Sequence, residues 1–257
     1  MIFKSHEEPD KDLYPDDDGL PMADNTLQYE WIVTIKGNMD ALFRHDPNVF
    51  VGGNLLWYAV EGEPTICTAP DALVVFGRPK GYRGSYMQWR EDDIAPQIVF
   101  EILSPSNRDA DMARKLEFYD HYGVEEYYLY DPEEVVLSGW QRVEGNLQAV
   151  SPMHGWTSPR LGIRFDMSGE ELVIFGPDNE PFLPFVAVKE QQEQERLRAD
   201  QAERRAREAE EQARLSQEQA RLSQEQAQHA QEQAQHAQQR AEQLAARLRA
   251  LGVDPDA

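Results

Sequence analysis

The sequence contains a single cysteine, Cys67, so no disulfide bond can form within one copy of the chain. This agrees with a reducing compartment, where a lone cysteine is expected to act as a small buried hydrophobe. There is no run of about eighteen apolar residues, the length that a membrane-spanning helix needs. The segment 1–12 also has no apolar core of a secretory signal. We therefore expect a cytoplasmic protein with no membrane partner.

Basic residues are scarce relative to acidic ones, and the formal net charge is -22. Residues 1–188 hold 33 Asp and Glu against 14 Lys and Arg. A broad nucleic-acid-binding face should be basic, so this charge argues against one. It fits a site that gathers carboxylates around a cation. The six histidines have no zinc-ligand spacing, and the sequence has no phosphate-binding loop of the P-loop type.

Aromatic residues, glycine and proline nearly disappear after residue 188, where Gln, Ala, Glu and Arg take over. The first part is long enough to bury a core, whereas the second cannot bury one by itself. The composition predicts an irregular arm at 1–23, a folded domain at 24–188, a helical tail at 189–251 and a disordered end at 252–257.

The tail carries a seven-residue repeat, with ARLSQEQ twice at 213–226 and related repeats at 227–240. Small residues alternate at spacings of three and four from Ala199, and the series ends in leucines up to Leu251. That spacing predicts a coiled-coil seam and a homo-oligomer formed through the C-terminal helix. The alternative is a solvated single helix, which Ala, Gln and Glu also favour.

The stretch from Pro96 to Pro132 organises the rest of the chain. Its apolar run 98–103 has the pattern of a strand buried on both faces, although it contains a carboxylate, Glu101. Helical spacing follows over 109–122 and ends at Gly123, before a second apolar run at 127–130. Strand, helix and strand in this order predict a crossover unit within an α/β (α+β) fold.

Other elements are expected on both sides of this unit. Asp24 or Asn25 can cap a helix that runs to about Arg44. We expect the segment 77–95 to be a long exposed loop that carries Arg78, Lys80, Arg83 and Arg90. Its part GRPKGYRG (77–84) interleaves basic and aromatic residues, which fits either an ordinary exposed loop or one that contacts a nucleic-acid strand. The predicted strands are 49–60 (interrupted at Gly52-Gly53), 65–68 and 72–76, a hairpin of 135–143 and 147–150, and short strands within 156–165 and 171–175.

Two carboxylates occupy strand positions, Asp71 just before 72–76 and Glu101 within 98–103. If these strands are neighbours, both carboxylates can converge on one hard cation such as Mg²⁺, and Lys115 from the following helix can reach the same place. An Asp after Pro is also a common turn residue, and a helix Lys is usually solvated. Glu101 differs, because an unpaired carboxylate among apolar neighbours is costly.

The ordered series of motifs resembles the Uma family of the PD-(D/E)xK, or restriction-endonuclease-like, superfamily. The resemblance covers roughly residues 24–188 and implies a mixed central sheet flanked by helices. It is carried by Pro70-Asp71, Glu101-Ile102-Leu103-Ser104-Pro105, Lys115-Leu116 with Tyr119, Gly123-Val124-Glu125-Glu126-Tyr127 and Asp131-Pro132.

The resemblance implies an endonuclease that hydrolyses phosphodiester bonds of nucleic acid, with DNA as the expected partner and Mg²⁺ as cofactor, replaceable by Mn²⁺. Asp71, Glu101 and the backbone carbonyl of Ile102 would be metal ligands. Lys115 would take the catalytic place of the superfamily lysine, which is Leu103 here, and Glu30 on the first helix would assist.

Asn54 stands where the resemblance leads us to expect an aspartate, so no role is assigned to it. A second function is also open. The alternative is a non-catalytic interaction or scaffold protein that keeps the nuclease fold and self-associates through its coiled coil. The acidic composition and the missing lysine at position 103 favour this alternative.

Overall fold

The computed structural model describes residues 13–17, 19, 23–107 and 109–250, with side chains up to residue 247. Two compact units are present, Met1–Val188 and Lys189–Ala257. The boundary falls where the composition of the sequence changes. The predicted disordered end at 252–257 and most of the predicted arm at 1–23 lie outside the described residues.

A mixed sheet forms the centre of the first unit, in the order β1-β4-β6-β7-β8-β9. Only β6 and β7 are parallel, and the other neighbouring pairs are antiparallel. This confirms the mixed central sheet that the family resemblance implies. Its strands are β1 (Val49–Gly53), β4 (Ala72–Phe76), β6 (Ile98–Ile102), β7 (Glu126–Asp131), β8 (Val136–Val143) and β9 (Asn146–Val150).

The crossover unit is confirmed. Every residue of β6 is buried, as expected for a central strand covered on both faces. Helix α2 (Asp109–His121) joins β6 to β7, which are parallel with Val99 opposite Tyr127. After the helix Gly123 adopts φ 92°, a left-handed conformation that glycine tolerates and that ends the helix.

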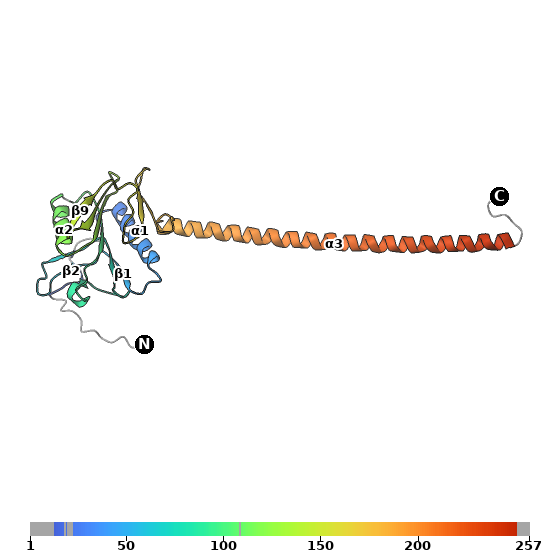
Figure 1. Cartoon of the computed structure of the whole chain (residues 1–257), viewed down its shortest axis with the longest axis horizontal. Coiled ribbons are helices and arrows are strands. Elements are labelled where there is room, and N and C mark those ends of the chain that lie inside the picture. Colours follow the sequence, from blue (N-terminus) through green and yellow to red (C-terminus); the bar gives the residue numbers. More distant parts are fainter. Residues whose placement is uncertain (1–12, 18, 20–22, 108, 251–257) are drawn as a thin grey trace. The chain divides into compact units, whose positions relative to one another are not determined.

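Two helices cover the two faces of the sheet (Figure 1). Helix α1 (Thr26–Leu42) packs Ile32, Ile35 and Met39 on the face that also carries Val74 and Phe100. Helix α2 packs on the opposite face, where Tyr119 lies among the side chains that alternate with these. The cap of α1 is Asn25, whose side chain accepts a hydrogen bond from the backbone N of Gln28 at 2.8 Å.

Small sheets complete the two layers. Strands β2 (Trp57–Tyr58), β3 (Cys67–Thr68) and β5 (Tyr86–Met87) form one sheet, and Trp57 and Tyr86 belong to the core on the α2 side. Strands β10 (Arg164–Asp166) and β11 (Val173–Phe175) form the other, on the α1 side. The predicted strand 49–60 is therefore two strands, β1 and β2, that belong to different sheets.

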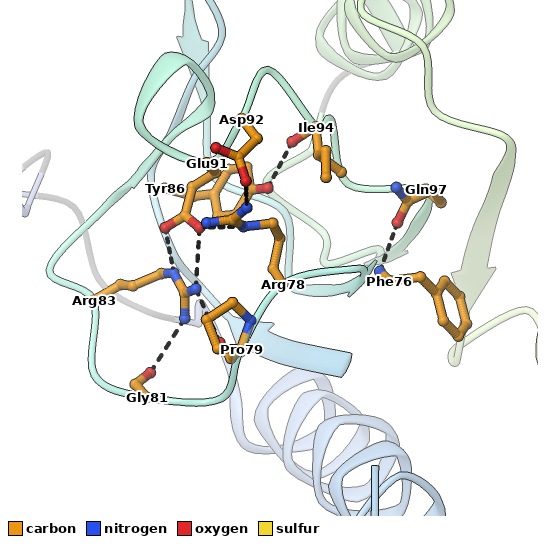
Figure 2. Close-up of polar contacts among 10 residues, drawn as sticks. All are labelled: Phe76, Arg78, Pro79, Gly81, Arg83, Tyr86, Glu91, Asp92, Ile94 and Gln97. Carbon is orange, nitrogen blue, oxygen red and sulfur yellow. Dashed lines mark hydrogen bonds and ion pairs between the residues drawn. The ribbon is translucent and has the colours of Figure 1, made fainter. Parts of the chain in front are cut away.

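The segment 77–95 is not the exposed loop that the sequence led us to expect, because it contains the buried strand β5 and a 3₁₀ turn, η1 (Gln88–Arg90). Figure 2 shows Glu91 between two arginines of this segment. Its carboxylate accepts from Arg78 Nε at 2.8 Å and from Arg83 Nε at 2.6 Å, and Arg83 also lies 4.0 Å over the ring of Phe50. Arg78 pairs with Asp92 as well.

These contacts change what the segment can do. Burial alone would raise the pKa of the Glu91 carboxyl, but the hydrogen bonds and charges of Arg83 and Arg78 outweigh burial and lower that pKa. Lys80 Nζ is 3.1 Å from the carbonyl oxygen of Val49. Most of the basic groups expected to contact a nucleic-acid strand are thus engaged inside the segment or against β1.

The tail is one helix, α3 (Phe185–Ala250), as predicted for 189–251. Its leucines at 197, 215, 222 and 244 are exposed within the single chain. Self-association through the heptad seam stays a prediction. Among the described residues, no helix combines the length and apolar character that crossing a membrane requires.

Part of the predicted arm packs on the first unit. Tyr14 is buried against Tyr58 and Trp89, and the hydroxyl of Tyr58 donates to the carbonyl oxygen of Pro15 at 2.8 Å. The described residues of the arm are irregular, as expected, but they contribute to the core.

Candidate active site at the ends of β4 and β6

Asp71 and Glu101 lie side by side on neighbouring antiparallel strands. Ala72 of β4 is opposite Phe100 of β6, so continuing this register by one residue sets Asp71 opposite Glu101 on the α2 face of the sheet. The backbone N of Ile102 donates to Asp71 Oδ2 at 2.7 Å. Both carboxylates are buried, with 7% of Asp71 and 3% of Glu101 exposed.

Helix α2 supplies two partners to Glu101, one turn apart. Lys115 Nζ is 2.8 Å from each of the two Glu101 carboxylate oxygens, and the Tyr119 hydroxyl donates to Oε1. Burial alone would lower the pKa of the Lys115 ammonium, but the charge and hydrogen bonds of Glu101 outweigh burial and raise it. Burial and the neighbouring Glu101 charge raise the pKa of Tyr119, which keeps its hydroxyl a donor.

Asp71 is less well compensated than Glu101. Burial, followed by the charge of Glu101, raises the pKa of its carboxyl to about 8, although the Ile102 N–H and the charge of Lys115 partly oppose this rise. Two carboxylates in one low-dielectric place disfavour each other's ionised form. A bound cation would relieve this repulsion, so the electrostatics of the pair suit a cation site.

The carboxylates open on a cavity of about 560 Å³. Asp71, Glu101 and Lys115 line it, together with Asn54 and Cys67. Cys67 was expected to be a small buried hydrophobe, but it is only half-buried. The backbone N of Asn54 donates to the Asp71 carbonyl oxygen at 3.1 Å, which ties this residue to the site through its main chain.

The donors suit Mg²⁺. Among the described residues no three His, Cys, Asp or Glu side chains gather as a metal-binding group, but Mg²⁺ needs only one or two carboxylates and keeps several waters. Asp71 and Glu101 carry hard oxygen atoms of the kind that Mg²⁺ prefers. The Ile102 carbonyl oxygen, expected as a further ligand, accepts a hydrogen bond from Gln28 Nε2 at 2.8 Å.

Gln28 is the site residue that sequence reasoning missed. It comes from α1 and is buried, and its Oε1 accepts from the backbone N of Asp24 at 2.8 Å. Its position one turn before Ile32 on the buried stripe was the available signal, because a polar residue on an apolar helix face must find a partner.

Glu30 does not reach this cavity. Two residues along a helix correspond to about 200° of rotation, so Glu30 cannot share the face of Gln28. It is exposed and lines a different cavity, with Trp31 and Phe182. The structure therefore separates Glu30 from Asp71, Glu101 and Lys115.

Asp24 is a second contributor that was not expected. Its carboxylate accepts from the hydroxyls of Ser104 and Ser106, and these two hydrogen bonds lower the pKa of Asp24. The contact joins the start of α1 to the loop after β6, and Asp24 and Ser106 both line the cavity.

Leu103 stands where the superfamily pattern has a lysine, and its side chain lines a separate cavity. Lys115 nonetheless brings an ammonium to Glu101 from the helix. The site therefore contains a lysine even though position 103 is a leucine in this chain.

Asp71 should make folding stability depend on pH. Its pKa is about 8 in the folded protein and near 3.8 without the fold, so the folded state holds more protons between these values. The free energy of unfolding should fall as pH rises through this window, by up to about 1.4 kcal/mol per pH unit from this group. Urea unfolding of wild-type and Asp71→Asn protein, each measured across the window, checks this, and parallel pH profiles would contradict it.

The first unit is thus a mixed α/β fold, with a central six-stranded sheet, helices on both faces and two acidic residues side by side on adjacent strands. The profile of a family described as "Uma2: Putative restriction endonuclease" matches residues 24–169. This is more than half of the sequence, and the chain belongs to that family.

One solved structure similar to this chain is that of an Anabaena variabilis protein described as a "putative nuclease". The two are 14% identical with a TM-score of 0.42, over 54% of this chain and 75% of the other. Comparison with curated proteins found no match.

Proposed function

We propose that this protein is a Mg²⁺-dependent endonuclease that hydrolyses phosphodiester bonds in DNA. The observation that carries the proposal is the meeting of Asp71 and Glu101 at one cavity, with the Lys115 ammonium at 2.8 Å from Glu101. Membership of the family supports the nuclease class. Two carboxylates and a lysine in one place are the groups that metal-assisted phosphodiester hydrolysis needs.

Each residue has a distinct role in this proposal. Asp71 and Glu101 would hold Mg²⁺, with the Ile102 carbonyl oxygen as a further metal ligand. When bound, Mg²⁺ acidifies a water and stabilises negative charge on the phosphate. Lys115 orients the attacking water and supports its deprotonation, while Tyr119 fixes Glu101 through the hydrogen bond to Oε1. Water adds across the P–O bond, and the sugar oxygen leaves with a proton.

The acidic surface sets the manner of DNA binding. Arg78 and Arg83 are engaged by Glu91, so these two cations of the segment 77–95 are less available to the phosphate backbone. Affinity should therefore depend less on salt than it does for proteins that neutralise many phosphates. The metal would supply much of the attraction between the substrate and the site.

Incubation of the full chain with supercoiled plasmid tests the proposal. We expect nicked and linear DNA with Mg²⁺ or Mn²⁺, and intact plasmid after chelation with EDTA, because the carboxylates alone cannot neutralise the phosphate. Structured and single-stranded RNA serve as parallel substrates. Binding of Mg²⁺ and Mn²⁺ is measured separately by calorimetry. If neither ion binds and neither DNA nor RNA is cleaved, the result would instead support the non-catalytic scaffold.

A further inference from the structure

Gln28 forms a bridge between the start of helix α1 and the end of strand β6. The residue is buried, with 6% of it exposed, and it lines the cavity of Asp71 and Glu101. Its Nε2 donates to the carbonyl oxygen of Ile102 at 2.8 Å, and its Oε1 accepts from the backbone N of Asp24 at 2.8 Å. Because a carbonyl only accepts and a backbone N–H only donates, these partners fix the orientation of the amide.

The Ile102 carbonyl needs this partner because the pairing of β4 with β6 ends before it. That ladder stops at Ala72 opposite Phe100, two residues before Ile102. The backbone N of Ile102 donates instead to Asp71 Oδ2 at 2.7 Å, and its carbonyl oxygen accepts from Gln28. Two side chains thus replace the missing strand, since buried backbone groups are nearly always paired.

The start of the helix accounts for only one of the two contacts of Gln28. Asn25 caps α1, so Gln28 is the third residue of the helix, and a Gln at that position commonly reaches back to a backbone N–H near the cap. The contact with Asp24 fulfils this local role. The contact with Ile102, 74 residues away, goes beyond it and brings an amide donor to the carbonyl that follows Glu101.

We propose that Gln28 is a positioning residue for the metal, an inference that rests on the proposed Mg²⁺-dependent function. A carbonyl oxygen has two lone pairs, so the Ile102 oxygen can keep the hydrogen bond from Gln28 and still coordinate a cation. The hydrogen bond fixes this oxygen at the cavity that the buried carboxylates of Asp71 and Glu101 share. Groups that hydrogen-bond to metal ligands commonly tune metal affinity in this way. Gln28 thus acts through Ile102 and is not itself a ligand.

The response of the Ile102 carbonyl to Mg²⁺ tests this role. The dipeptide Ile-Leu occurs once in the sequence, at Ile102-Leu103, so ¹³C in isoleucine carbonyls and ¹⁵N in leucine isolate this carbonyl by NMR. In the full chain its signal should shift during titration with Mg²⁺, with the same midpoint as binding measured by calorimetry. Mg²⁺ binding that leaves the signal unmoved would overturn the role of Gln28 alone. The absence of any Mg²⁺ binding would overturn both this role and the proposed metal-dependent cleavage.

A matched pair of variants separates positioning from general stability. Gln28→Met removes the amide and keeps an unbranched side chain, and it should raise the dissociation constant for Mg²⁺ about tenfold. Ile32→Val is the control, because Ile32 is buried one turn later on the same helix and does not line the cavity. It loosens the core but should leave Mg²⁺ affinity within about twofold of wild type. Wild-type affinity in Gln28→Met, or an equal loss in both variants, would overturn the proposal.

Discussion

Asp71→Asn and Glu101→Gln proteins are each expected to cleave plasmid DNA at least about a thousandfold more slowly than the wild-type chain in Mg²⁺. Both substitutions keep the shape of the side chain and remove its charge. In the Asp71→Asn protein the amide oxygen can still accept from the N–H of Ile102, and in the Glu101→Gln protein it can still accept from Tyr119. The loss should therefore reflect weaker metal binding and not a broken fold.

Glu117→Gln is the matched control for these variants. Glu117 is exposed on the same helix as Lys115 and Tyr119, and it does not line the cavity. Its substitution removes one negative charge from the surface and should leave the cleavage rate within about twofold of wild type. Single-turnover rates over a range of Mg²⁺ concentrations separate weaker metal binding from slower chemistry. Wild-type rates in either site variant would exclude the proposed roles of Asp71 and Glu101.

Local sequence patterns predicted the central part of this site. The apolar run around Glu101 has the pattern of a strand buried on both faces, and β6 is fully buried. A carboxylate in such a strand requires partners, and the following helix places Lys115 and Tyr119 one turn apart to meet it. The spacing of apolar residues was sufficient to predict these contacts, because the strand, the helix and the next strand follow one another directly in the sequence.

Contacts between distant segments were not predictable in the same way. Gln28 meets Ile102 across 74 residues, and nothing in the helix pattern says which strand end a buried amide will reach. The resemblance favoured Glu30, but the cap at Asn25 and the apolar stripe place Gln28 on the buried face instead. In the segment 77–95, Arg78 and Arg83 both pair with Glu91 of the same segment. The sequence shows the basic residues, but it does not show that an acidic residue of the same segment pairs with them.

Lys115→Met is expected to destabilise the first unit by about 3–5 kcal/mol. Glu101 is only 3% exposed, whereas 26% of the Lys115 side chain is exposed. Removing the lysine therefore leaves a largely buried carboxylate without its positive partner, and the hydrogen bond from Tyr119 does not replace a positive charge. Urea unfolding followed by tryptophan fluorescence measures this loss, since all five tryptophans lie within residues 1–188.

Glu101→Gln in the Lys115→Met background should recover much of that stability, because the double variant has no buried charge to solvate. Glu101→Gln alone should cost less than Lys115→Met alone, since the partly exposed ammonium can turn toward water. The double variant should remain inactive on plasmid DNA. This combination of restored stability and absent cleavage would separate the structural role of the ion pair from its chemical role. Additive destabilisation in the double variant would instead mean that the pair is not coupled in the folded protein.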